Sequence, residues 1–146
     1  MTIKCFRNMA EFIAFLEEKG QLHRVTVPVD PELEITEITD RVVKSGGPAL
    51  LFEQVRGSDV PLVTNLMGTA QRMAWALGVE NLETQAARIA RFVSTDIPSG
   101  WAGKFGRLVE LAKSGRYFPH EVKSAPCQEV VMEKDFDLNA LPIMKC

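Results

Sequence analysis

The feature that most constrains this fold is an amphipathic helix that ends at a Gly-Gly-Pro triplet. An apolar strand follows the triplet directly. Gly46-Gly47-Pro48 ends the helix, because glycine tolerates the left-handed backbone of a helix end and proline cannot continue a helix. Ala49–Phe52 follows as a continuous apolar run of strand length. This succession predicts α+β architecture, with helices flanking a small sheet. The expected buried side of the helix consists of Leu33, Ile35, Ile38, Val42 and Val43.

We expect this helix to begin at Asp30-Pro31. Aspartate is a good N-cap, and proline at the first helical position loses nothing by lacking an N–H. Carboxylates in this region could pair as general acid and base. However, Glu37–Arg41 and Asp40–Lys44 have the spacing of favourable i,i+4 ion pairs, which indicates a solvated helix face instead. The carboxylates considered are Glu32, Glu34, Glu37 and Asp40.

Further helices and strands are bounded by polar caps and glycines. Asn8, Thr69 and Asn81 are the expected N-caps, and Gly20 and Gly78 the expected stops. The expected helices cover residues 9–19, 70–77, 82–92 and 104–113, and the expected strands cover 22–27, 61–65 and 128–132. A loop is expected over 96–103 and a turn over 135–138. The strand over 61–65 should pair in antiparallel fashion with the strand over 49–52. We therefore predict an N-terminal α+β domain over residues 1–98 with a small mixed sheet, a helical connection over 99–124, and a further segment over 125–146.

Composition excludes several classes of protein. The 146 residues are 46% hydrophobic, enough for a core without metal or disulfide staples. Seventeen Lys and Arg against 19 Asp and Glu leave no basic excess for a dedicated nucleic-acid binder. Cys5, Cys127 and Cys146 lie far apart, which excludes a structural zinc site and indicates reduced thiols. Without a signal peptide or a spanning segment, we expect a cytoplasmic protein, at most in peripheral contact with a membrane.

The two histidines and the cysteines offer little catalytic promise. His23 and His120 could each serve as a general base, but neither has a Ser or Cys motif nearby, so surface or satisfied core positions are favoured. Cys127 lacks a neighbouring cation that would lower its pKa, which favours a small buried hydrophobe. Cys146, as the last residue, gives no further indication.

Phosphate and base recognition also lack a convincing motif. Gly46-Gly47-Pro48 has neither dinucleotide-fold nor P-loop spacing and ends a helix, so a turn explains it. Trp75 and Trp101 are too separated to form a base-stacking platform, and Trp75 is expected in the core. From the residues alone we predict no catalytic, cofactor-binding or metal-binding residue in the chain.

Several strings nevertheless resemble, in order and spacing, the N-terminal part of the UbiD family, above all the 3-polyprenyl-4-hydroxybenzoate carboxy-lyases of ubiquinone biosynthesis. The resemblance covers nearly the whole chain, and its most specific element is the helix that leads into Gly-Gly-Pro and a strand. Met67 departs from the Phe expected there, at a position that we expect to be core-like. The strings are Pro28–Asp30, Leu33–Ile38, Asp40-Arg41, Gly46–Glu53, Asn65–Thr69, Ala125–Gln128, Asp137–Asn139 and Leu141–Ile143.

The resemblance implies reversible, non-oxidative decarboxylation of an aromatic or α,β-unsaturated acid. Family members use prenylated FMN held through a divalent metal, usually manganese, and a monovalent cation, and a Glu–Arg–acid network positions the substrate carboxylate. Loss of carbon dioxide leaves electron density on carbon, which the cofactor ring accepts. The family also tends to form homo-oligomers.

In the family, these catalytic residues lie in a central split-barrel domain whose motifs follow the Leu-Pro-Ile string, so none can be transferred to this chain. We therefore expect 125–146 to be the truncated start of that flavin-binding barrel, and the chain to be inactive alone. The missing central and C-terminal domains are its expected partners. A stand-alone interaction domain is the main alternative, and a small-ligand module ranks below it. We expect Ala140–Met144 to be an apolar strand of the second domain. A decarboxylase part should expose this strand, whereas a stand-alone module should bury it.

Overall fold

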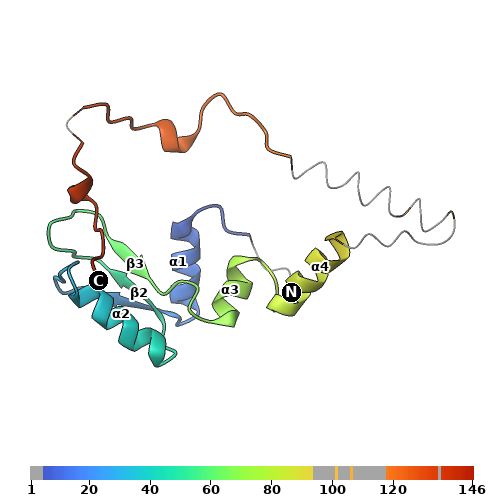
Figure 1. The fold of residues 1–146 in the computed structure, drawn as a ribbon, viewed down its shortest axis with the longest axis horizontal. Coiled ribbons are helices and arrows are strands. Elements are labelled where there is room, and N and C mark those ends of the chain that lie inside the picture. Colours follow the sequence, from blue (N-terminus) through green and yellow to red (C-terminus); the bar gives the residue numbers. More distant parts are fainter. Residues whose placement is uncertain (1–4, 94–100, 102–105, 107–117, 135) are drawn as a thin grey trace. The chain divides into compact units, whose positions relative to one another are not determined.

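A computed structural model describes residues 5–93, 101, 106, 118–134 and 136–146 (Figure 1). The chain divides into two compact units. The first contains Met1–Arg88 together with Asp137–Cys146, and the second contains Ile89–Phe136. The elements that bear on function lie in the first unit.

A three-stranded mixed sheet forms the centre of the first unit. The strands are β1 (Leu22–Val25), β2 (Ala49–Phe52) and β3 (Leu62–Thr64), in the order β1-β2-β3. Strand β1 pairs with β2 in parallel, with Leu22 opposite Ala49, whereas β3 pairs with β2 in antiparallel fashion. Helix α2 (Glu34–Lys44) forms the crossover that two successive parallel strands require. The small mixed sheet flanked by helices is therefore confirmed.

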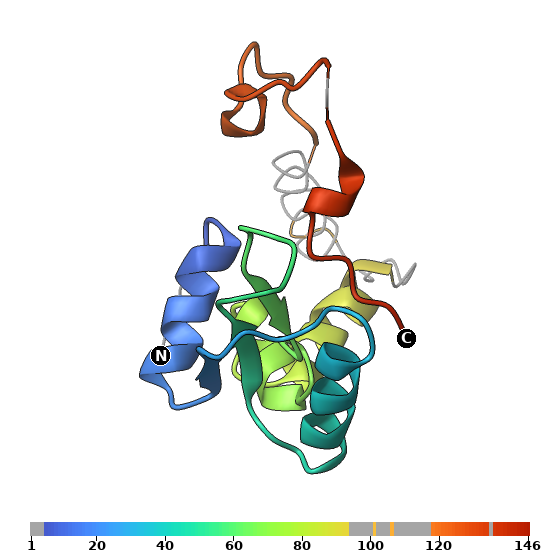
Figure 2. The same cartoon turned by 90° about the vertical axis from the view of Figure 1, so that its left-hand side faces the viewer.

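The central strand supplies both hydrophobic clusters, because successive side chains of a strand point to opposite faces. Leu50 and Phe52 pack on one face with Ile35 of α2, and all three are at most 2% exposed. On the other face, Ala49 packs with Leu16 of α1 (Met9–Glu18). Figures 1 and 2 show α2 on one side of the sheet and α1 and α3 on the other.

The helix boundaries follow local signals for most of the first unit. Helix α3 spans Ala70–Ala76 and α4 spans Leu82–Val93, close to the expected ranges. The three predicted N-caps are confirmed: the side chains of Asn8, Thr69 and Asn81 accept hydrogen bonds from the backbone N–H groups of Glu11, Arg72 and Thr84.

The Gly-Gly-Pro triplet ends α2 as expected. Gly46 has φ +68°, and its N–H donates to Val43 O at 3.0 Å, while the Gly47 N–H donates to Val42 O at 2.8 Å. This pair of bonds is the Schellman pattern, which satisfies carbonyls at the end of the helix. The triplet therefore ends a helix, which agrees with its interpretation as a turn instead of a phosphate-binding loop.

The beginning of α2 differs from the prediction. The helix begins at Glu34, not at Asp30-Pro31, and its N-cap is Leu33 with φ 66° and ψ −40°. The reason lies far away in the sequence: Pro31 O accepts from Lys145 N–H, and Leu33 N–H donates to Lys145 O. These bonds hold residues 31–33 outside the helix. Leu33 and Val43, both expected on the buried side, are 61% and 47% exposed.

The described part of the second unit contains no strand, so the strand predicted over 128–132 is wrong. A short 3-10 helix, Pro126–Gln128, occupies its start. Val130, Val131 and Met132 follow with exposures of 74%, 70% and 65%. An extended segment becomes a strand only when a neighbouring strand satisfies its backbone groups, and no described residue pairs with this one.

The strand expected over 140–144 does not form. Ala140 ends a 3-10 helix, and residues 141–144 belong to no strand.

The turn predicted over 135–138 is displaced toward the C-terminus, because the 3-10 helix Leu138–Ala140 begins at the last residue of that range. Asp137 accepts from Asn139 N–H at 2.9 Å and begins a 3-10 helix, Leu138–Ala140, whereas Asp135 lies outside the described residues. The loop over 96–103, the helix over 104–113 and the boundary near residue 98 also fall almost wholly outside them and remain predictions. Among the helices that are described, none is long and apolar enough to cross a membrane.

Candidate functional site

The acidic residues around α2 form a solvated helix face, as the sequence indicates. Glu37 pairs with Arg41 and Asp40 with Lys44, each at 2.6 Å. The Glu34 carboxylate instead accepts from Asp30 N–H at 2.7 Å, and Glu32 lies 3.4 Å from Lys145 Nζ. Each of the four carboxylates is exposed and has a partner among the described residues, as expected of a solvated helix face.

The histidines and cysteines are all at the surface. His23 in β1 and His120 are exposed, which agrees with the surface positions expected for them. The prediction that Cys127 is buried is wrong: it lies in the 3-10 turn Pro126–Gln128, which contains no buried residue. Cys5 and Cys146 are exposed as well.

The predictions that Trp75 and Met67 are buried have different outcomes. Trp75 is half-buried and packs edge-on against Phe15, with ring centroids 5.4 Å apart, so it borders a core cluster as expected. Trp101 is 91% exposed. Met67, expected at a core-like position, is 48% exposed because it lies in the turn between β3 and α3.

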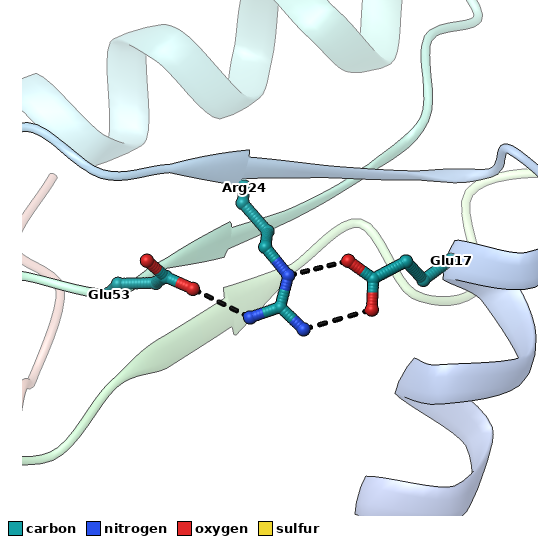
Figure 3. A network of polar contacts seen from close by, with 3 residues as sticks. All are labelled: Glu17, Arg24 and Glu53. Carbon is teal, nitrogen blue, oxygen red and sulfur yellow. Dashed lines mark hydrogen bonds and ion pairs between the residues drawn. The ribbon is translucent and has the colours of Figure 1, made fainter.

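A charged network that the sequence analysis missed joins α1, β1 and the residue after β2 (Figure 3). Arg24 binds Glu17 with two hydrogen bonds, from Nε at 2.6 Å and from Nη2 at 2.9 Å. Its Nη1 donates to Glu53 at 2.6 Å. The three side chains are between 34% and 46% exposed. A Glu–Arg–Glu set has the residue types of a network that binds a substrate carboxylate. Here Glu17 and Glu53 already accept the hydrogen bonds of the Arg24 guanidinium, in the places that a substrate carboxylate would take.

The network shifts the titration of its members. The hydrogen bond from Arg24, together with the charge of Arg24, holds the pKa of Glu17 below its usual value despite partial desolvation. The hydrogen bonds to Glu17 and Glu53 raise the pKa of Arg24 further. A lowered carboxyl pKa means that the folded protein favours the ionised form of Glu17, so the contact stabilises the fold only while Glu17 is ionised.

We expect Glu17→Gln to lower stability at pH 7 by a small amount and to have less effect at pH 3. The contribution of Glu17 is fully present above its unfolded pKa near 4.5 and is lost as the pH falls through the lower folded value. The measurement is the urea midpoint of the chain and of the variant at both pH values. Glu18→Gln, which alters only the pair with the adjacent Lys19, serves as the control. A difference that stays constant between pH 7 and pH 3 would contradict this role.

The side chains of Asn65 and Arg72 lie close to Gly68, in the turn that leads into α3. Asn65, with φ 56°, donates from its amide to Gly47 O at 3.2 Å and Pro48 O at 2.8 Å. A Cβ on Gly68 would overlap Asn65 Oδ1 and lie 2.8 Å from Arg72 Nη2. The Asn65–Thr69 string of the resemblance therefore has a structural explanation: it anchors the turn to the Gly-Gly-Pro triplet.

Arg72 is a buried cation in this region. Its side chain is 1% exposed and donates from Nη1 to Gln21 Oε1 at 3.1 Å, while Nε and Nη2 have no hydrogen-bond partner in the described part of the chain. Burial lowers the pKa of Arg72. A guanidinium still remains protonated near neutral pH, because its ordinary pKa lies above about 12.

The metal-ligating side chains and the depressions of the described residues bear on where a flavin and its metal could bind. No group of three or more His, Cys, Asp or Glu side chains that could hold a metal ion occurs among them. An open depression of about 330 Å³ is lined by Pro28, residues 53–56, Ser58 and Asp59, most of them polar. A flavin site needs a deep and largely apolar cleft. Another depression, beside Ala70 and Ala74, has only about 100 Å³.

Comparison with known proteins gives this scaffold a family. The family model for the N-terminal domain of 3-octaprenyl-4-hydroxybenzoate carboxy-lyases, UbiD_N, matches residues 13–91. The chain belongs to this UbiD N-terminal domain family. The resemblance noted from the sequence strings is thereby confirmed. A relative from Aquifex aeolicus (strain VF5), an uncharacterized protein, is 43% identical over 143 residues, which cover 97% of this chain and 29% of the relative.

Solved structures of UbiD-class decarboxylases are similar to the chain. Vanillic acid decarboxylase of Sedimentibacter hydroxybenzoicus in its open form matches 97% of this chain and 28% of its own, with 28% identity and a TM-score of 0.70. An evolved dimeric form of the UbiD-class enzyme HmfF from Pelotomaculum thermopropionicum, in complex with prFMN, matches 64% of this chain and 21% of its own, with 38% identity and a TM-score of 0.54. The chain thus spans less than a third of the length of these relatives.

Proposed function

We propose that the chain is the N-terminal scaffold of a prenylated-FMN-dependent, non-oxidative decarboxylase whose active site is built from residues outside these 146. One observation carries the proposal. Nearly the whole chain matches the fold of a UbiD-class decarboxylase, but only 28% of that enzyme's length, so most of such an enzyme has no counterpart in these residues.

The proposed reaction is removal of the carboxylate from 3-polyprenyl-4-hydroxybenzoate in ubiquinone biosynthesis, by a cytoplasmic enzyme that forms homo-oligomers. The description of the matching family, with its octaprenyl hydroxybenzoate, supports this choice of substrate. Prenylated FMN, bound with manganese in the part of the enzyme outside this chain, supplies the conjugated acceptor for the electrons left by carbon dioxide. The structure of HmfF with prFMN supports this choice of cofactor.

The chain's own contribution is a rigid platform and an apolar contact surface. Leu141, Ile143 and Met144 are 41%, 55% and 41% exposed, which is the exposure expected of a decarboxylase part. Val130 and Val131 add further exposed apolar area. Large apolar surface of this kind is normally covered by a partner. We propose that residues 125–146 lead into the flavin-binding barrel and that the catalytic part of the enzyme covers these side chains.

A stand-alone interaction domain is the alternative function. It would use the same exposed side chains to bind a separate protein, and it would have no decarboxylase attached to it. The exposed stretch Leu141–Met144 favours the decarboxylase part, because an independent module would be expected to bury it.

The test is a chimera in which this chain replaces the matching N-terminal part of the Sedimentibacter vanillic acid decarboxylase. We expect the chimera to fold and to release carbon dioxide from vanillic acid once prenylated FMN is supplied, because the catalytic residues come from the host enzyme. A matched chimera that carries Phe52→Ala, which damages the platform, should lose most of that activity. A folded chimera that binds the flavin but has no activity, or a Phe52→Ala chimera as active as its parent, would contradict the scaffold role.

A further inference from the structure

The first turn of α2 contains one residue more than a regular α-helical turn. Ile35 N–H bonds to Asp30 O at 3.2 Å, which spans five residues where a regular α-helix spans four. Glu34 N–H bonds to Glu32 O at 2.8 Å, across Leu33. With φ 66° and ψ −40° at Leu33, this is close to the classic γ-turn, which is rare and strained for a residue with a side chain.

The side chains of Asp30 and Glu34, on either side of Leu33, already make hydrogen bonds of the kind that cap a helix. Asp30 Oδ1 accepts from Glu32 N–H at 2.8 Å, and the Glu34 carboxylate accepts from Asp30 N–H at 2.7 Å. These are reciprocal bonds of the capping-box kind, displaced by one residue. Asp30 at the cap and Pro31 at the first helical position would suit a helix that begins three residues earlier.

The C-terminal segment Asp137–Cys146, here called the strap, maintains the irregular start. Lys145 N–H donates to Pro31 O at 3.0 Å, and Lys145 O accepts from Leu33 N–H at 3.1 Å and from Thr36 Oγ1 at 3.1 Å. Ser58 Oγ anchors the other end of the strap, at Ala140 O, with a distance of 2.7 Å. Figure 2 shows the end of the strap beside α2.

We propose that the first turn of α2 is a two-state element controlled by the strap. With the strap docked, Leu33 keeps its left-handed backbone and the helix begins at Glu34. With the strap released, Leu33 N–H loses its acceptor, and residues 31–33 join the helix with Asp30 as N-cap. Ile35, which is 0% exposed, keeps the helix on the sheet in both states. The start of α2 therefore reports whether the strap is docked, independently of the decarboxylase proposal.

Nuclear magnetic resonance of the full chain tests the coupling. Lys145→Pro removes the N–H that Pro31 O accepts, whereas Lys145→Ala removes only the exposed side-chain pair with Glu32 at 3.4 Å and serves as the matched control. In the proline variant, we expect the Cα shifts of Glu32 and Leu33 to become helical. Exchange of the Leu33 amide should be roughly ten-fold faster, as for a locally opened region. In the alanine variant, both readouts should stay within about two-fold of the parent chain.

A second variant separates strap release from a direct effect of proline. Ser58→Ala loosens the strap at Ala140 without touching α2, so it should also accelerate exchange at Leu33 and shift Glu32 toward helical values, by less than Lys145→Pro does. Non-helical Glu32 and Leu33 in the proline variant would overturn the proposal. Equal helical shifts in Lys145→Pro and Lys145→Ala would also overturn it, because the main-chain bonds would then not control the turn.

Discussion

Replacement of Gly68 by alanine is expected to lower the free energy of unfolding by about 3 kcal/mol or more, a loss reserved for severe steric or core changes. The added Cβ would overlap Asn65 Oδ1 and press on Arg72 Nη2. Asn65 cannot move aside without breaking its bonds to Gly47 O and Pro48 O. Chemical denaturation followed by the fluorescence of Trp75, which packs on Phe15, measures the loss.

Gly57→Ala is the matched control for this substitution. Gly57 has φ +80° but open space around its Cα, so only the backbone cost of about 1 kcal/mol is expected. If Gly68→Ala does not fold, adding Asn65→Gly removes the clashing side chain and should restore a folded protein. Equal losses of unfolding free energy in the Gly68 and Gly57 variants would show that the contact with Asn65 does not destabilise the Gly68 variant.

Truncation of Phe52 to alanine is the second change with a large expected effect. Phe52 is 0% exposed at the end of the central strand and belongs to the cluster with Ile35 and Val29. Removing a buried phenyl ring leaves a cavity and is expected to cost about 3–5 kcal/mol. A single domain has a total stability of about 5–15 kcal/mol, so this loss is a large share of the total. It should appear as a large fall in the urea midpoint of unfolding.

Phe118→Ala supplies the control, because Phe118 is 72% exposed. Its removal should change stability by no more than about 0.5 kcal/mol. The comparison uses the same loss of a phenyl ring at two positions of opposite burial. A Phe52 variant as stable as the Phe118 variant would contradict the assignment of the core to the α2 face of the sheet.

Local sequence signals predicted most of the first unit, since its caps and stops act over a few residues. Asn8, Thr69 and Asn81 cap their helices through bonds that span three residues. Gly46 ends α2 through bonds to the preceding turn. The strand Ala49–Phe52 is a continuous apolar run because it is central in the sheet and covered on both faces.

The incorrect predictions concern structure determined by distant residues. The start of α2 depends on Lys145, more than 100 positions away from Thr36 with which it bonds. The segment 128–132 has a strand-like composition, but no described residue pairs with it. Cys127 has the character of a core residue, and its exposure follows from the same lack of neighbours.

For the candidate site, the sequence predicted the surroundings of side chains but not their contacts across elements. The ion pairs of Glu37 with Arg41 and of Asp40 with Lys44 and the surface position of the histidines agree with the sequence. The network of Glu17, Arg24 and Glu53 was missed because Arg24 is 7 positions from Glu17 and 29 from Glu53, and the three residues lie on α1, on β1 and just after β2. No spacing rule brings such residues together before the sheet register is known.

In the function that we propose, the chain provides a platform and the flavin binds elsewhere in the enzyme. The most direct measurement is a titration of the purified 146-residue chain with prenylated FMN and manganese, followed by an assay for carbon dioxide release from 4-hydroxybenzoate-type acids. We predict no saturable change in flavin fluorescence and no carbon dioxide above the level without protein. Stoichiometric flavin binding, or turnover that is lost on heating the chain, would contradict the account.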